Sequence, residues 1–225
     1  MTEITEHLAE IVERVARAAQ GAHAAGAVTI VAVSKAQPAS AIREAFFAGQ
    51  AHFGESYVQE AVDKIAELAA LDITWHFVGR LQANKTRAVA EAFQWVHTVD
   101  RDKLAQRLSE QRPAHAPPLN VLIQVNQAHE PQKAGVAPHD VAPLARAVRA
   151  MPRLALRGLM TIPPASDAHG AAHWFAELAA LRRSLAADGI ELDTLSMGMS
   201  ADFETAIAAG SNCVRVGTAI FGARR

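Results

Sequence analysis

The stretch VTIVAVS at residues 28–34 has the composition of a buried β-strand, because β-branched and small apolar residues fill almost all of it. A lysine, Lys35, follows the run directly. Short apolar runs of the same kind recur along the chain, and alanine-rich stretches with helical spacing separate them. This alternation of strand and helix is the feature that decides the fold.

The pattern predicts eight strands, namely VTIVAVS (28–34), HFG (52–54), ITWHFVG (73–79), WVHTV (95–99), LNVLIQVN (119–126), LALRGLM (154–160), TLSM (194–197) and CVRVG (213–217). The helices expected between them span 39–48, 57–70, 84–92, stretches beginning at 102 and 138, 168–187 and 201–209. An amphipathic helix over 5–19 is expected before the first strand.

Strands that are apolar on both faces favour a parallel sheet with helices packed around it. The chain has 225 residues, half of them hydrophobic, which suits one core. We therefore expect an α/β fold, a single (β/α)8 barrel domain over 1–225 with an extra N-terminal helix. A doubly wound open sheet is the alternative.

The composition makes several partners unexpected. Lysine plus arginine number 22 against 23 acidic residues, so the net charge of -1 gives no reason to expect nucleic acid or an anionic membrane. The single cysteine, Cys213, excludes an intrachain disulfide and a cysteine-based zinc site. No apolar run approaches the ~18–20 residues that span a bilayer, and the charged N-terminus lacks a signal-peptide core. We expect a soluble, cytoplasmic protein without a metal.

Residues that end the strands are the candidates for chemistry, because (β/α)8 barrels place their sites at the C-terminal ends of the strands. Lys35 ends the first strand. It is either a solvated lysine or an amine whose pKa is lowered by partial burial and which can then form a Schiff base with an aldehyde. The position alone does not decide between the two.

The ends of the last two strands predict a phosphate site. Ser200 closes SMGMS at 196–200, and Gly217 and Thr218 follow Arg215 at the end of the eighth strand. Glycines, hydroxyls and free backbone N–H groups in such loops bind phosphate. Because the eighth strand of a barrel lies beside the first, these loops and Lys35 together predict a site for a phosphorylated aldehyde.

Three further strand ends have a structural and a functional interpretation. Ser56 is placed to cap the helix after the second strand. His76, in the third strand, faces the barrel interior either as a hydrogen-bonded core residue or as a ligand-binding group. Met160, at the end of the sixth strand, is either packing or an apolar wall for a flat ring.

Five motifs occur in order along the chain: AVSKAQP (32–38), FGESYVQEA (53–61), WHFVGRLQANK (75–85), GLM (158–160) and LSMGMSADFETAIAAGSNCVRVGTAIFG (195–222). In these motifs the chain resembles the pyridoxal phosphate homeostasis protein family. The resemblance implies a barrel like the N-terminal domain of alanine racemase, with pyridoxal 5′-phosphate (PLP) held on the first-strand lysine. That residue is Lys35 in this sequence.

The resemblance also implies roles for other residues. The phosphate of PLP is expected to meet Ser200, Gly217 and Thr218, with Met197 and Met160 near the ring or the phosphate loop. Ser56 and His76 complete the expected PLP-binding set, which contains no catalytic residue. The resemblance places Arg215 at the pyridine nitrogen, where a cation keeps that nitrogen unprotonated and weakens the ring as an electron sink.

The sequence departs from the family at several positions. Ser56 replaces the usual asparagine, Gln37 replaces a frequent second lysine, and the ending after Ala223 lacks a lysine-containing tail. Lys133, in HEPQKAG, is expected to be solvated, and a role as a second PLP-receiving lysine rests on analogy alone. The departures at Ser56, Gln37 and the ending each remove a polar contact or an amine.

The resemblance implies a carrier that buffers PLP or delivers it to apo-enzymes, as a monomer without substantial turnover. The alternative is a PLP-dependent amino-acid racemase, which needs two opposed bases at the substrate α-carbon. Alanine racemase takes its second base from a tyrosine on a C-terminal domain. The only tyrosine here is Tyr57, on or just before the second helix of the barrel. A third possibility is a different phosphorylated ligand bound without a Schiff base.

Overall fold

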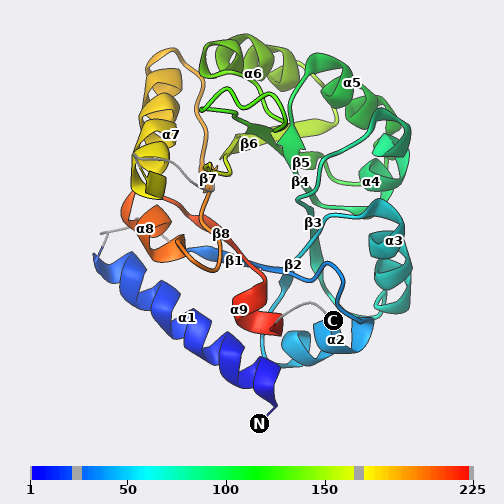
Figure 1. Ribbon diagram of the computed structural model, residues 1–225. Coiled ribbons are helices and arrows are strands. Elements are labelled where there is room, and N and C mark those ends of the chain that lie inside the picture. The colour runs from blue at the N-terminus through cyan, green and yellow to red at the C-terminus, as the bar shows by residue number, and fades with distance from the viewer. Residues whose placement is uncertain (1, 22–26, 165–169, 223–225) are drawn as a thin grey trace.

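The computed structural model describes residues 2–21, 27–164 and 170–222. Within them, eight parallel strands close into a barrel in chain order, with the helices on the outside (Figure 1). The strands are β1 (Thr29–Val33), β2 (His52–Glu55), β3 (Thr74–Phe77), β4 (Trp95–Val99), β5 (Leu119–Gln124), β6 (Leu154–Met160), β7 (Thr194–Ser196) and β8 (Cys213–Val216). The predicted (β/α)8 barrel is confirmed.

The helices are α1 (Glu3–Gly21), α2 (Ala39–Phe47), α3 (Val58–Glu67), α4 (Thr86–Ala92), α5 (Asp102–Gln111), α6 (Val141–Arg149), α7 (Gly170–Ala187), α8 (Phe203–Ala208) and α9 (Thr218–Phe221), with 3-10 turns η1 (Ala83–Lys85) and η2 (Pro138–Asp140). The short α9 was not expected, and α3 ends earlier than its pattern suggested. The predicted start of α7 at 168 and the ending after 223 lie outside the described residues. None of the described helices is long and apolar enough to cross a membrane.

Helix α1 lies outside the barrel, along α8, α9 and α2 (Figure 1). Its apolar stripe of Leu8, Ile11 and Val15 is buried, as the helical spacing predicted. Arg14 Nε and Nη2 donate to the two carboxylate oxygens of Glu204 in α8, at 2.9 and 3.1 Å. The extra helix therefore supports the side of the barrel where the first and last strands meet.

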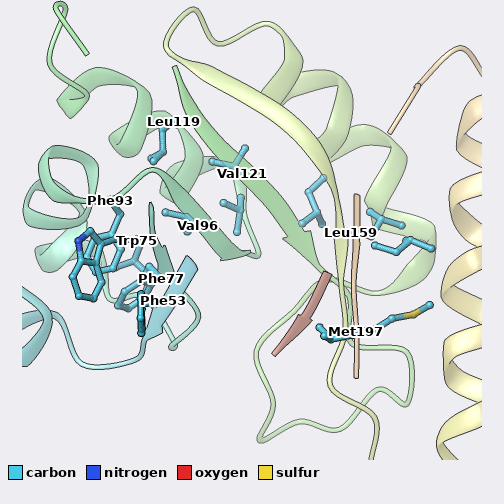
Figure 2. Packing of buried hydrophobic residues seen from close by; sticks show 14 of the residues in the cluster. Phe53, Trp75, Phe77, Phe93, Val96, Leu119, Val121, Leu159 and Met197 are labelled. Atoms are coloured by element: carbon cyan, nitrogen blue, oxygen red, sulfur yellow. The ribbon is translucent and has the colours of Figure 1, made fainter. Parts of the chain in front are cut away.

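Outward-facing strand residues form the core between the barrel and its helices (Figure 2). Phe53, Phe77 and Phe93 are fully buried, and the rings of Phe77 and Phe93 meet edge to face with their centroids 5.5 Å apart. Burying one such side chain contributes about 1.5–3 kcal/mol. Successive strand residues point to opposite faces, so each neighbour of an outward phenylalanine in β2 or β3 points into the barrel.

One glycine of β6 is required by close backbone packing. A Cβ on Gly158 would lie 1.8 Å from the carbonyl oxygen of Thr194 in β7. Real side chains do not approach that closely, so the strands would have to separate locally. Gly158 therefore allows β6 and β7 to pair as they do.

A chain of hydrogen bonds crosses the barrel interior. His52 Nδ1 lies 3.0 Å from His76 Nε2, and His76 Nδ1 lies 2.9 Å from His97 Nε2. His97 Nδ1 lies 2.9 Å from Ser196 Oγ, and Arg215 Nη1 donates to the same Oγ at 2.7 Å. These hydrogen bonds connect side chains of β2, β3 and β4 to side chains of β7 and β8. They hold the guanidinium of Arg215 from the interior of the barrel.

The charge of Arg215 selects the direction of these bonds. Because Ser196 Oγ accepts from a cation, its own hydrogen is best donated to the lone pair of His97 Nδ1. His97 then donates from Nε2 to His76, and His76 donates from Nε2 to His52. Burial lowers the pKa of His76 and His97 well below the ordinary 6.5, and it lowers the pKa of His52 as well. All three rings are therefore neutral at pH 7.

Replacing Gly158 with alanine is expected to lower the free energy of unfolding by about 3 kcal/mol, at the upper end of overpacking costs. Urea denaturation followed by circular dichroism would measure the loss. Gly21→Ala is the matched control, because no non-neighbouring atom of the described residues lies within 4 Å of its added Cβ at the end of α1. Equal stability of the two variants would contradict the close packing of β6 on β7.

Nitrogen NMR of the histidine rings is expected to find His52, His76 and His97 as neutral Nε2–H tautomers at pH 7. Since their folded pKa values are depressed, the unfolded chain binds more protons below about pH 6.5, and stability should fall as the pH drops from 7 to 5. For the two fully buried rings the slope is on the order of 2–3 kcal/mol per pH unit. Nδ1–H tautomers at all three rings would show that the hydrogen bonds are donated in the opposite direction, from His52 toward Ser196.

Candidate functional site

A cavity of about 330 Å³ opens at the C-terminal ends of the strands. Small-molecule sites usually have volumes of about 300–1,000 Å³. Its polar lining consists of side chains from both ends of the chain, namely Lys35, Ser56, Ser200, Arg215 and Thr218. Its remaining lining is apolar or small, namely Val33, Val78, Ile162, Met199, Ala201 and Gly217. The structure thus brings together most of the residues that the sequence singled out.

Lys35 lies in a tight turn directly after β1. Gln37 N donates to Ser34 O at 3.0 Å, which closes a four-residue turn with Lys35 and Ala36 at its centre. Ala36 has a φ of 59°, in the left-handed region that few residues other than glycine adopt. The turn ends the strand abruptly and leaves Lys35 half-buried at the cavity wall.

The loops after β7 and β8 meet around the hydroxyl of Ser200. Its Oγ accepts from the backbone N–H groups of Gly217 and Ala219, at 3.3 and 3.4 Å. A Cβ at position 217 would lie 3.2 Å from the carbonyl oxygen of Val33, so glycine lets β8 approach β1 closely. With the exposed Thr218 beside them, these groups form a set of donors that suits an anion.

Arg215 supplies the cation of the cavity. Its side chain is 5% exposed, and its Nη2 donates to the carbonyl oxygen of Thr161 at 2.9 Å, in addition to the bond to Ser196. Burial lowers the pKa of the guanidinium, yet an arginine remains charged at neutral pH. A buried positive charge therefore faces the cavity in a fixed orientation.

The structure corrects the cap expected at Ser56, and it places His76 in the barrel interior, as expected, but away from the 330 Å³ cavity. The proposed helix cap at Ser56 is wrong, because α3 begins at Val58 with Tyr57 as the capping residue and without a side-chain cap. Ser56 lines the 330 Å³ cavity instead. His76 does not line that cavity. It borders a second one, of about 290 Å³, beside the first residues of several strands and hence at the opposite end of the barrel.

The two predicted methionines do not line the cavity. Met160 and Met197 are both fully buried and are absent from the cavity lining. Met197 belongs to the core cluster (Figure 2). The apolar wall comes from Ile162 and Met199, which are 37% and 39% exposed. Sequence reasoning missed both.

Lys133 is not a freely solvated side chain. Its Nζ donates to Pro163 O at 3.1 Å and pairs with Glu130 Oε2 at 2.5 Å. It borders a cavity of about 240 Å³ that shares Val78 and Ile162 with the larger cavity. The solvated interpretation is therefore wrong for this side chain.

A buried ionic cluster behind the Lys35 turn was also missed. Glu55, the last residue of β2, is fully buried, and Lys64 Nζ in α3 lies 2.7 Å from its Oε1. Burial raises the pKa of the Glu55 carboxyl, and the bonds from Lys64 and Ser34 oppose that rise. A glutamate directly after an apolar strand was the available signal.

The geometry suits a small anionic molecule that can react with an amine. A half-buried lysine, a buried cation and a set of hydroxyl and backbone donors surround one cavity. Within the described ranges, no group of three or more histidine, cysteine, aspartate or glutamate residues is arranged to hold a metal ion.

Comparisons with known proteins identify the family of the chain. The family model for the alanine racemase N-terminal domain matches residues 7–225. The pyridoxal phosphate homeostasis protein of Pseudomonas aeruginosa is 55% identical over 225 residues, covering all of this chain and 97% of the relative.

Among solved structures, PipY of Synechococcus elongatus without PLP is 39% identical, with a TM-score of 0.87 over 97% of this chain and all of PipY. PipY with PLP bound superposes with a TM-score of 0.81 over 94% of this chain. An alanine racemase of Clostridium difficile shares the fold at 13% identity, with a TM-score of 0.75, and the match covers 57% of that enzyme. The chain belongs to the alanine racemase N-terminal domain family, among the pyridoxal phosphate homeostasis proteins.

Proposed function

We propose that this protein binds PLP in the 330 Å³ cavity, bonded to Lys35, and takes part in PLP homeostasis in the cell. The observation that carries the proposal is that the amine of Lys35 and the donors of Ser200, Gly217 and Thr218 line one cavity. Relatives named for this function, and a relative solved with PLP, support it.

Each polar group of the cavity has a part in the proposal. PLP, when bound, would supply an aldehyde for a Schiff base and a conjugated ring that can withdraw electrons. Lys35 would provide the amine for the covalent bond, while Ser200, Gly217 and Thr218 would bind the phosphate. Arg215 would bring its positive charge to the ring and disfavour protonation of the pyridine nitrogen. Ser56 contributes a hydroxyl in the same cavity.

Ile162 and Met199, rather than the two buried methionines, provide the apolar contacts of the ring in this proposal. His76 acts indirectly, through the hydrogen bonds that fix Arg215.

Racemase activity is the less favoured alternative. It requires a second base opposite Lys35, and the described cavity lining contains no tyrosine, histidine or cysteine. Tyr57 is 58% exposed and does not line the cavity. Because Arg215 also weakens the ring as an electron sink, the site favours holding PLP over turning a substrate over.

The proposal includes a cellular setting. The protein buffers PLP and releases it to apo-enzymes that require it. It acts as a monomer, with 1–225 as one barrel domain. We place it in the cytoplasm, where a single cysteine, buried as Cys213 is, suits a reducing compartment.

Purified protein mixed with PLP is expected to develop an absorption band in the violet part of the visible spectrum. Borohydride should bleach this band, because the reduced C–N bond to Lys35 is no longer conjugated with the ring. Lys35→Ala should abolish the band, and mass spectrometry of the reduced protein should find one modified peptide, the one containing Lys35.

Lys103→Ala, at an exposed lysine of α5, is the matched control and should retain the full band. Label on Lys133 instead of Lys35 would move the site to the neighbouring cavity. A protein that takes up no PLP would refute the proposal.

PLP-loaded protein is expected to racemise no amino acid by itself, yet to restore activity when mixed with an apo-enzyme that lacks PLP. The reconstitution rate, compared with that from the same concentration of free PLP, separates handover from slow release. Racemisation that scales with the loaded protein and disappears in Lys35→Ala would favour the enzyme alternative. No reconstitution at all would contradict both buffering and delivery.

A further inference from the structure

The turn that carries Lys35 rests on a buried ionic cluster formed by Glu55, Glu60 and Lys64. Lys64 Nζ lies 2.7 Å from Glu55 Oε1 and 2.5 Å from Glu60 Oε1, so one ammonium bridges two carboxylates. The Lys64 side chain is 8% exposed and that of Glu55 is fully buried. The three residues come from the end of β2 and from α3, and the cluster borders the turn rather than the cavity.

The cluster holds the residues on both sides of Lys35. Before it, Ser34 Oγ donates to Glu55 Oε1 at 2.7 Å, and Ser34 O accepts from Lys64 Nζ at 2.8 Å. After it, the backbone N–H of Ala36 donates to Glu60 Oε1 at 2.7 Å. Two backbone bonds and one side-chain bond, all to charged groups, therefore hold the residues on either side of the lysine.

The turn needs such support because its conformation is unfavourable. Ala36 is exposed and has a φ of 59°, where the Cβ of an L-residue crowds its own backbone. Little burial at this position compensates for the strain, so the bond from Ala36 N–H to Glu60, together with the bond from Gln37 N–H to Ser34 O, favours the left-handed turn.

The cluster is also costly as a purely structural device. Glu55 Oε2 is buried and has no hydrogen-bond partner among the described residues. Buried ion pairs of this kind can often be replaced by apolar side chains without loss of stability. Strained backbone held by surrounding groups is characteristic of functional sites.

We propose that Glu60 and Lys64 are positioning residues, which lock the Ser34–Gln37 turn so that Lys35 Nζ is presented to the 330 Å³ cavity. Lys35 also borders a much smaller pocket with Gln37 and Phe221, so the turn decides between two directions for the amine. This inference rests on the proposed function. In the bond-forming step, Lys35 Nζ attacks the aldehyde carbon of PLP as a neutral amine, a C=N bond replaces C=O, and the oxygen leaves as water.

The test measures how fast the absorption band grows after PLP is added, and how much Lys35 peptide borohydride traps. Glu60→Ala removes the acceptor of Ala36 N–H and is expected to slow the reaction at least about tenfold, a change of about 1.4 kcal/mol. Glu60→Asp keeps the charge beside Lys64 but is one methylene shorter, and it should be slowed similarly. Glu60→Gln keeps an acceptor at full reach and should stay within about threefold of the natural protein.

Binding of pyridoxine 5′-phosphate separates positioning from general damage. This analogue has an alcohol in place of the aldehyde, so it occupies the cavity without bonding to Lys35. Its Kd should be unchanged in Glu60→Ala, and equal weakening of both measurements would overturn the proposal. Glu67→Ala is the matched control, because Glu67 lies on the same helix and its one ion pair among the described residues is a 3.8 Å surface pair with Arg43.

Ala36→Gly tests the strain directly, since glycine adopts a positive φ without crowding. In that background Glu60→Ala should slow the reaction at least threefold less than it does alone. Wild-type rates in both Glu60→Ala and Glu60→Asp would overturn the inference while leaving the proposed function intact. Absence of the band in the natural protein would instead refute the proposed function.

Discussion

The pairing of β1 with β8 is the interaction on which the site depends. It closes the barrel in parallel register, with Thr29 opposite Cys213 and Val31 opposite Arg215. Because the strands end side by side, the turn with Lys35 and the loop with Gly217 border one cavity, although they lie near opposite ends of the sequence. Because Gly217 has no side chain, the end of β8 can approach the backbone of Val33 in β1 closely. Helix α1 reinforces the β1–β8 junction from outside.

Inside the closed barrel, the interior contains polar groups where most cores contain apolar ones. The histidine side chains hydrogen-bond one another, and the series of bonds ends at Arg215, whose guanidinium can donate hydrogen bonds but cannot accept them. Such a fully connected network is rigid, because displacing one member leaves another unpaired. The guanidinium of Arg215 is therefore held from the interior, while the residues on either side of Lys35 are held by Glu60 and Lys64.

The sequence predicted the fold well, because every apolar run between helical stretches became a strand. It also placed Lys35, Ser200 and Thr218 at strand ends, where the barrel gathers them. It did not predict that His76 borders the cavity at the opposite end of the barrel, or that Met160 and Met197 are absent from the lining of the 330 Å³ cavity, because the depth of a residue along the barrel depends on strand register. Irregular pairing shifts that register, as it does between Val96 and Val99. The ionic cluster could not be predicted, because its contacts to the turn join residues that are distant in sequence.

A site divided between the first and last strands links ligand binding to completion of the fold. The β1–β8 contacts have the greatest sequence separation of any strand pair, so closing that loop carries the largest chain-entropy cost. A molecule that contacts both strands favours the closed barrel over any state with an open edge. An incompletely synthesised chain, or one frayed at β8, would lack the cavity altogether. Occupancy of the cavity therefore reports that the barrel has closed.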